Sequence, residues 1–366
     1  MVRLPFGLAQ GGRSPQVRNQ KFLVTGGAGF IGSNLALTLQ AKFPKAWIVV
    51  VDDFRSGNFE NLRDFRGDVV AADVSRLDWE TQFRREKFDA IFHEASITDT
   101  TEHEQLFQVH DNVEGFRRLL DYAKPRRVPV VYASSAATYG QTTGVNREDQ
   151  PAAPANIYAF SKMVLDNLTR FYGTGAGALK IVGLRYFNVY GPREKHKLKA
   201  ASMIFQLCEQ MKGGRRPRVF KHGEQKRDFV YVKDVVAETI AALGASKTGV
   251  YNAGSGTARS FNDIISILNQ SLGTDLEPDY FDNPYAFYQS YTQADMTRAK
   301  RDLNFSPGYT LELGIADYVK ELKGLGSGAE DLGSRVKGQG SGGRGHEDPS
   351  PKLIGKPPKH ESVPSF

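Results

Sequence analysis

A tyrosine and a lysine in this sequence have the spacing that acid–base chemistry needs. Tyr158 and Lys162 are four residues apart in the segment YAFSK, so one helical turn would place them on the same face. A free tyrosine has a pKa of about 10, and a nearby ammonium group favours its ionised form. The phenolate can then take a proton from a substrate hydroxyl near neutral pH. Ser135, at the end of an apolar run, could hold that hydroxyl.

A run of charged residues follows a glycine–proline turn later in the chain. In the segment YFNVYGPREKHK, residues 193–197 are all ionisable. A charge run alone is usually a solvated loop. This one follows directly after the last of a series of apolar runs. A loop at the carboxyl edge of a parallel sheet can lie over a reaction cleft, so a functional role is the alternative.

A glycine-rich turn indicates a dinucleotide site. The segment VTGGAGFIGSN places Gly26, Gly29 and Gly32 between a strand-like run and a helix-like run. Such glycines allow a tight turn, a close approach of backbone amides to a pyrophosphate and close helix packing. Asp52 follows 20 residues after Gly32, where an acid commonly binds the adenosine ribose. Asp52 favours NAD because a carboxylate repels a 2′-phosphate, whereas Arg55 could pair with that phosphate. The sequence therefore leaves NADP and NAD open.

These residues need a sheet to position them. Short apolar runs alternate with helix-like patterns and lack strict polar alternation, as expected for strands covered on both faces. Strand–helix alternation predicts right-handed crossovers and an α/β fold with a doubly wound parallel sheet of the Rossmann type. The expected strands lie within residues 21–26, 46–53, 67–74, 88–95, 128–135 and 179–191.

The sequence also predicts how the chain is divided. A smaller α/β substrate-binding domain should accompany the nucleotide-binding domain. The last 43 residues are rich in glycine and proline and hold too few apolar residues to offset the entropy of ordering. The predicted segments are a flexible leader at 1–20, an NAD(P)-binding domain at 21–187 to which 229–256 returns, a substrate-binding domain at 188–228 and 257–323, and a disordered tail at 324–366.

Composition narrows the classes of partner. The net charge is +7, but residues 1–20 carry three arginines and no acid, so the excess does not indicate a nucleic-acid surface. No apolar run reaches the roughly 18–20 residues that span a bilayer. The single cysteine, Cys208, excludes an internal disulfide, and we expect a cytoplasmic protein. His93 has no second residue at metal-ligand spacing, so no metal is expected.

Four segments together resemble the extended short-chain dehydrogenase/reductase family: TGGAGFIG, SSAATYG, YAFSK and RYFNVYGPR. The resemblance covers about residues 21–323 and implies an enzyme that acts on nucleotide sugars with a bound nicotinamide cofactor. Within that family, GPREKHK, KRDFVYVKDV and YTQADM resemble the ADP-glyceromanno-heptose 6-epimerases. This implies oxidation and re-reduction at C-6 of ADP-heptose. It also implies that Lys197, the lysine of the H-K pair, is a second acid/base.

The resemblance assigns roles residue by residue, and we expect NADP as the cofactor with NAD as the alternative. The implied catalytic residues are Tyr158, Lys162, Lys197 and Ser135. The implied cofactor contacts are Gly26, Gly29, Phe30, Ile31, Gly32, Asp52, Asp53, Arg55, Glu94, Ala95, Ser96, Asn112, Lys162 and Val189. The implied substrate contacts are Ser135, Asn188, Lys199, Gln206, Phe220, Arg227 and Tyr288.

Other functions remain as alternatives. The chain departs from the family pattern at Leu198, where a glycine is common, and at Lys199 and Gln206. A UDP-hexose 4-epimerase is the nearest alternative, and it would not need Lys197. A dehydratase is disfavoured because residues 136–137 are both alanine, where that class carries an acidic pair. A non-catalytic dinucleotide-binding protein is the alternative from another class. We also expect a homo-oligomer.

Overall fold

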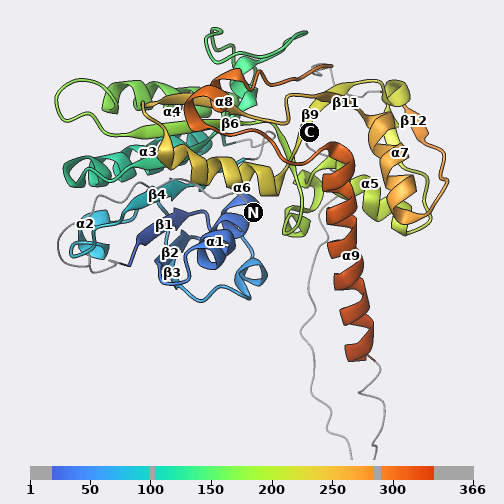
Figure 1. The fold of residues 1–366 in the computed structure, drawn as a ribbon, viewed down its shortest axis with the longest axis horizontal. Coiled ribbons are helices and arrows are strands. Elements are labelled where there is room, and N and C mark those ends of the chain that lie inside the picture. The colour runs from blue at the N-terminus through green and yellow to red at the C-terminus, as the bar shows by residue number, and fades with distance from the viewer. Residues whose placement is uncertain (1–18, 99–103, 283–289, 334–366) are drawn as a thin grey trace, which may run out of the picture.

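The apolar runs form the strands of one parallel sheet (Figure 1). The computed structural model describes residues 19–98, 104–282 and 290–333. The main sheet has seven strands in the order β10-β6-β5-β4-β1-β2-β3, and the neighbouring strands run parallel. Its strands are β1 Lys21–Thr25, β2 Trp47–Asp52, β3 Asp68–Ala71, β4 Ala90–His93, β5 Val130–Ser135, β6 Ile181–Tyr186 and β10 Gly249–Ala253.

Helices cover both faces of this sheet because its strands are apolar on both sides. Val24 and Val50 belong to one buried cluster, with α1 and α6 side chains, while Leu23 and Val49 belong to the other, with α2, α3 and α4 side chains. Successive strand residues point to opposite faces, so each strand contributes side chains to the buried clusters on both faces of the sheet. The predicted doubly wound parallel sheet is thus confirmed. The covering helices are α1 Phe30–Lys42, α6 Val232–Ala241, α2 Trp79–Gln82, α3 Gln105–Arg126 and α4 Ile157–Tyr172.

A smaller region lies at one end of the main sheet, to the right in Figure 1. It contains a three-stranded sheet in the order β11-β9-β7 and a two-stranded sheet of β12 and β8. Its strands are β7 Asn188–Tyr190, β8 Arg218–Phe220, β9 Lys226–Tyr231, β11 Ala258–Ser260 and β12 Asp279–Phe281. Its helices are α5 Met203–Lys212, α7 Phe261–Leu272 and α9 Leu311–Gly333, whereas α8 Thr297–Leu303 lies beside β10.

Two predicted segments are divided differently in the structure. The apolar run 179–191 is not one strand: it breaks at Phe187 into β6 of the main sheet and β7 of the smaller sheet. Residues 229–256 do not return to the main sheet as one piece. β9 pairs with β7 and β11, and only α6 and β10 return. The backbone pairing of β9 with β7, rather than its apolar composition, decides where that strand lies.

One helix extends into the segment that the sequence predicts as a tail. We expected disorder from residue 324, but α9 continues to Gly333. Adding residues to an existing helix costs much less than nucleating one, so a packed first half can extend into a glycine-rich segment. Residues 334–366 and most of the leader lie outside the described residues. Among the described residues, no helix is both long enough and apolar enough to cross a membrane.

Candidate active site

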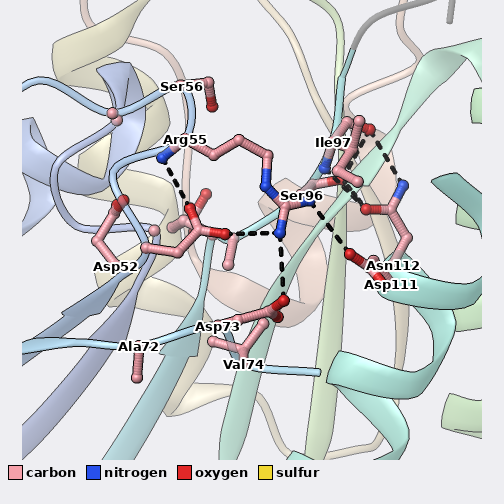
Figure 2. Close-up of a pocket in the computed structure, with 16 residues that line it drawn as sticks. Asp52, Arg55, Ser56, Ala72, Asp73, Val74, Ser96, Ile97, Asp111 and Asn112 are labelled. Atoms are coloured by element: carbon pink, nitrogen blue, oxygen red, sulfur yellow. Dashed lines mark hydrogen bonds and ion pairs between the residues drawn. The ribbon is translucent and has the colours of Figure 1, made fainter. Parts of the chain in front are cut away.

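An open cleft lies at the carboxyl ends of β1, β2, β3 and β4 (Figure 2). The order of the main sheet reverses between β1 and β4, and ligands of such sheets bind at that point. The glycine-rich turn forms one wall. Gly26 has φ 67°, and a Cβ there would come within 2.5 Å of the Ala95 nitrogen. A Cβ on Gly32 would come within 2.1 Å of the Gly26 oxygen, so both positions require glycine.

The turn fits the pyrophosphate of a dinucleotide. α1 begins at Phe30 with Gly29 as its N-cap, and no side chain accepts from its first amides. Free amides at a helix N-terminus favour a phosphate group. A Cβ on Gly29 would meet only the Gly26 oxygen, at 3.1 Å, so the backbone is open on the side away from the turn. The residues present therefore fit the diphosphate of a nicotinamide dinucleotide.

Asp52 ends β2 beside this turn. Its Oδ2 accepts the Ala28 amide at 2.9 Å, and its Oδ1 accepts the Phe54 amide at 2.8 Å. Burial raises the pKa of Asp52, and the two amides oppose that shift. The carboxylate thus joins the glycine-rich turn to the loop after β2. It lines the cleft where the sequence predicts contact with a ribose.

Arg55 is surrounded by carboxylates in the same cleft (Figure 2). Its guanidinium pairs with Asp53 at 2.9 Å, Asp73 at 3.2 Å and Asp111 at 3.1 Å. Asp73 and Asp111 were not predicted as site residues, although the sequence held a signal for both. Asp73 follows β3 at the carboxyl edge of the sheet, and Asp111 directly precedes Asn112. Since three acids already compensate Arg55, its charge is much less available to a further anion.

The reactive side chains come from α4 and the end of β5. The Asn156 side chain caps α4 by accepting the Ala159 amide at 2.8 Å, so the helix begins one residue before Tyr158. The Tyr158 hydroxyl lies close enough to Ser135 for that side chain to lower its pKa. Lys162 Nζ lies 5.8 Å from the centroid of the Tyr158 ring and donates to the Ala133 carbonyl at 2.7 Å. The structure thus brings Tyr158, Lys162 and Ser135 together.

Burial perturbs the proton affinities of this group. It lowers the pKa of Lys162 to about 8, while the Glu94 and Asp166 carboxylates oppose the shift. Burial also raises the pKa of Tyr158, and the Ser135 side chain opposes that rise. In the unliganded protein the phenol is therefore protonated at neutral pH, so ionising it requires additional positive charge nearby.

Two residues that follow β4 add further polar contacts to the cleft. Burial raises the pKa of Glu94 to about 7, and its Oε1 accepts the Tyr186 hydroxyl at 3.0 Å. Ser96 donates to the Asn112 Oδ1 at 3.2 Å, and Asn112 donates to the Ser161 hydroxyl of α4 at 3.0 Å. The cleft wall is thus joined to the helix that carries Tyr158.

Lys197 lies at the glycine-rich turn and not out in solvent. It stands in the short 3₁₀ helix η3, Lys195–Ala200, and is partly buried. Its Nζ is 5.7 Å from the centroid of the Phe30 ring, at the start of α1. Burial lowers the pKa of Lys197, and the Glu194 carboxylate opposes the shift. A second amine therefore stands beside the cofactor-binding turn.

The structure places the predicted cofactor residues in two groups. One group lines the cleft: Gly26, Gly29, Asp52, Asp53, Arg55, Glu94, Ala95, Ser96 and Asn112. The other lies outside its lining. Phe30, Ile31 and Gly32 begin α1, Lys162 is buried on α4, and Val189 on β7 packs against the core. Further lining residues that the sequence analysis missed are Ser56, Gly57, Ala72, Val74 and Ile97.

The predicted substrate residues are more scattered: apart from Ser135, those that the structure describes belong to the smaller region. Asn188 is exposed on β7, and Lys199 is exposed on η3. Gln206 donates to the Lys199 and Ala201 carbonyls. Phe220 is buried on β8 and stacks edge-on against Phe281, and Arg227 is buried on β9. None of these five lines the cleft. Tyr288 lies outside the described residues.

No metal cluster accompanies this cleft: the described ranges contain no group of three or more His, Cys, Asp or Glu side chains that could hold a metal ion. His93 is fully buried, and burial lowers its pKa to about 3. Its Nδ1 forms a hydrogen bond with the Thr25 hydroxyl at 2.8 Å, and its ring stacks on Phe116. A structural role for this histidine fits these contacts.

Comparisons with known proteins agree with this geometry. The chain is similar to ADP-L-glycero-D-manno-heptose-6-epimerase from Helicobacter pylori, with 42% identity and a TM-score of 0.79 over 83% of this chain and 96% of that one. UDP-glucose 4-epimerase from Thermotoga maritima has 28% identity and a TM-score of 0.77, over 84% and 99%. UDP-glucuronic acid 4-epimerase from Bacillus cereus, in complex with UDP-glucuronic acid and NAD, has 28% identity and a TM-score of 0.73, over 83% and 100%. The model of the NAD dependent epimerase/dehydratase family matches residues 22–254, and the chain belongs to that family.

Proposed function

We propose that this protein is a nucleotide-sugar epimerase that inverts C-6 of ADP-glycero-manno-heptose through a 6-keto sugar. The observation that carries the proposal is the position of Lys197, a second amine at the glycine-rich turn, on a loop separate from the Tyr158–Lys162 helix. The 42% identity with the Helicobacter pylori heptose 6-epimerase supports this substrate over a UDP-sugar.

The cleft supplies the binding site for a nicotinamide dinucleotide. The amides of the glycine-rich turn receive the diphosphate, and Asp52 binds the hydroxyls of the adenosine ribose. Such a cofactor, when bound, takes a hydride from the sugar and later gives it back. We expected NADP from the sequence, but NAD is the better fit. Asp53, Asp73 and Asp111 compensate the charge of Arg55 and would repel a 2′-phosphate.

Tyr158 is the acid/base for one half-reaction. Its hydroxyl lies close to Ser135, which can hold the substrate oxygen that gains or loses a proton. Lys162 lies one helical turn away and stabilises the phenolate form through its charge. Burial raises the pKa of Tyr158 in the free protein, so ionisation of this phenol would require further positive charge close to it.

Lys197 is the acid/base for the other half-reaction. An epimerase removes a hydride from one face of a carbon and returns it to the opposite face. The intermediate ketone must turn relative to the nicotinamide, so its oxygen points in a different direction. A donor in a second position can then protonate that oxygen. The lowered pKa of Lys197 brings its amine closer to the neutral form that a base requires.

Turnover of defined sugar nucleotides tests the substrate and the reaction. The purified protein is incubated with one C-6 epimer of ADP-glycero-manno-heptose, or with UDP-glucose, and the products are analysed by NMR. We expect the other heptose epimer, with no deuterium at C-6 when the reaction is run in D₂O, because the hydride does not exchange with solvent. Turnover of UDP-glucose alone would instead identify a 4-epimerase. Bound cofactor without turnover of either substrate would identify a binding protein.

Cofactor affinity is measured on the same protein. Titration calorimetry with NAD and NADP should give the tighter binding for NAD. Tighter binding of NADP would contradict the argument from the carboxylates around Arg55.

A further inference from the structure

The loop that carries Lys197 has a strained backbone. We call residues 191–202 the Lys197 loop; it leaves β7 at Gly191 and ends at Ser202, the N-cap of α5. Gly191, Arg193 and Leu198 have φ values of 144°, 71° and 51°. Two of these three residues carry side chains, which makes their left-handed conformations costly. Contacts with the rest of the protein must therefore hold this loop in shape.

One buried carboxylate joins the two ends of the Lys197 loop. Glu194 is 0% exposed. Its Oε1 accepts the Gly191 amide at 3.1 Å and the Ser202 hydroxyl at 2.9 Å, and its Oε2 accepts the Ser202 amide. Burial and the nearby Glu194 carboxylate raise the pKa of the Tyr318 hydroxyl of α9, so these two side chains lie close together. Hydrogen bonds to a buried charge are about twice as strong as neutral ones, so this single side chain fixes the first and last residues of the loop.

The backbone of Glu194 also fixes the turn that leads to Lys197. The Lys197 amide donates to the Glu194 carbonyl at 2.9 Å, which forms the turn that starts η3. The Glu194 side chain is buried among Gly191, Ser202 and Tyr318, whereas the Lys197 side chain reaches the Phe30 ring. Glu194 thus acts on the backbone that carries the amine, and neither Glu194 nor Lys197 is among the residues that line the cleft.

Contacts on the other side of the loop dock it against the cofactor-binding turn. Asn34 of α1 donates to the Pro192 carbonyl at 2.9 Å and accepts from the Arg193 guanidinium at 3.1 Å. Asn61 donates both to the Ala28 carbonyl at 3.0 Å and to the Arg193 carbonyl at 3.3 Å. These bonds hold the first half of the loop. The second half, which includes Lys197 and Leu198, is closed by Glu194 and Ser202.

We propose that Glu194 is a positioning residue for the reaction, whose buried carboxylate closes the Lys197 loop and so holds the Lys197 amine at the sugar carbon. The inference rests on the proposed two-base epimerase. It predicts that loss of this carboxylate impairs only the half-reaction that Lys197 serves. Tyr158 stands on α4 and does not depend on this loop.

The variant Glu194→Gln tests this directly. Glutamine has nearly the same shape, but its amide nitrogen donates and cannot accept from the loop amides. NAD-loaded protein is mixed rapidly with each C-6 epimer of ADP-glycero-manno-heptose, and the rise of reduced nicotinamide absorbance is followed. Lys197→Met should slow oxidation of one epimer by about a hundredfold. Glu194→Gln should slow oxidation of the same epimer by about tenfold or more and leave the other within about twofold.

Two further variants serve as controls for the Glu194→Gln experiment. Lys195→Met removes an exposed lysine from the same loop and should not change the rate of oxidation of either epimer. Ser202→Ala removes one donor to the carboxylate and covers the case in which Glu194→Gln fails to fold. It should slow the oxidation of the epimer that depends on Lys197 by a few-fold only, because the Ser202 amide still donates to Glu194.

The possible outcomes separate the two proposals. Suppose that Lys197→Met slows the oxidation of only one epimer. The role of Glu194 is then overturned if Glu194→Gln and Ser202→Ala slow the oxidation of both epimers equally, or if they slow the oxidation of neither. If Lys197→Met itself oxidises both epimers at the normal rate, the two-base function fails first, and the positioning role fails with it.

Discussion

Lys162 illustrates at the scale of a residue how the site controls its charge. The amine is buried beneath Tyr158, and burial alone would favour its neutral form. Glu94 and Asp166 oppose this, so that the pKa settles at about 8 and the charged form predominates at neutral pH. Two nearby carboxylates thus help to keep the buried amine charged.

Leu198 adopts a conformation suited to glycine. Its φ of 51° and ψ of −116° are strained for a residue with a side chain, and the side chain is 76% exposed. The sequence already set this position apart, because a glycine is common there in the heptose 6-epimerases that the chain resembles. The residue therefore contributes strain to the Lys197 loop with little compensating burial.

Leu198→Gly should stabilise the protein by about 1 kcal/mol. Relief of strain of about 1–3 kcal/mol exceeds the entropy cost of a glycine. Urea unfolding measures the change. Leu313→Gly is the control, since it changes another exposed leucine that lies inside α9 and should destabilise by about 1 kcal/mol. A loss of stability in both variants would contradict the argument.

At the scale of elements, α4 positions the chemistry through its first turn. Tyr158 is the second residue of that helix, and the Asn156 cap fixes where the helix begins. A frayed first turn would move the phenol relative to Ser135, which stands on the separate element β5. The geometry of Tyr158 and Ser135 therefore depends on a capping residue that does not line the cleft.

Asn156→Ala should cost about 1 kcal/mol of stability and lower kcat more than it raises KM. Steady-state kinetics with the ADP-heptose epimers and urea unfolding measure both effects. Asp78→Ala is the matched control, because Asp78 caps α2 in the same way and does not line the cleft. It should lower stability without changing kcat. Equal kinetic effects in the two variants would show that the cap acts only through global stability.

The elements themselves were largely predictable, and their contacts were not. Apolar runs bounded by turns predicted the strands of the main sheet, because both faces of each strand are buried. The split of residues 179–191 at Phe187 was missed because β7 pairs with β9, about 40 residues away. The sequence offered Arg55 as a possible partner of a 2′-phosphate for the same reason. Its partner Asp111 is 56 residues distant, and sequence spacing does not predict that contact.

At the scale of the molecule, the site joins parts of the chain that fold into different sheets. The cofactor turn, the Tyr158 helix and the cleft acids belong to the main sheet, whereas the Lys197 loop leaves from β7 (Figure 1). Asn34 and Asn61 connect the two. Membership of the extended short-chain dehydrogenase/reductase family was predicted from short motifs and is confirmed. The docking of the loop on α1 required the structure.

The buried histidine under the cleft makes stability depend on pH. His93 has a pKa of about 3 in the folded protein, against 6.5 for an exposed histidine, so only the unfolded chain takes up its proton between those values. Its contribution to stability is present above about 6.5 and is lost as the pH falls toward 3. Glu94 acts oppositely between about 7 and 4.5, because its folded pKa is raised.

His93→Gln should therefore lessen the loss of stability in acid. The free energy of unfolding, measured in urea between pH 7.5 and 4.5, should fall less steeply below pH 6.5 in the variant than in the parent protein. The change in each protein is taken relative to its own free energy of unfolding at pH 7.5, which already includes the loss of the contacts with Thr25 and Phe116. If the two curves stay parallel across this range, His93 is not the group responsible.

The most direct test of the two-base account compares Tyr158→Phe with Lys197→Met. Each NAD-loaded variant is mixed with each C-6 epimer of ADP-glycero-manno-heptose, and formation of reduced nicotinamide is followed in a single turnover. We expect each variant to oxidise one epimer about a hundredfold more slowly and the other at the normal rate. The epimer that is affected should differ between the two variants. Full oxidation and epimerisation of both epimers by Lys197→Met would contradict it.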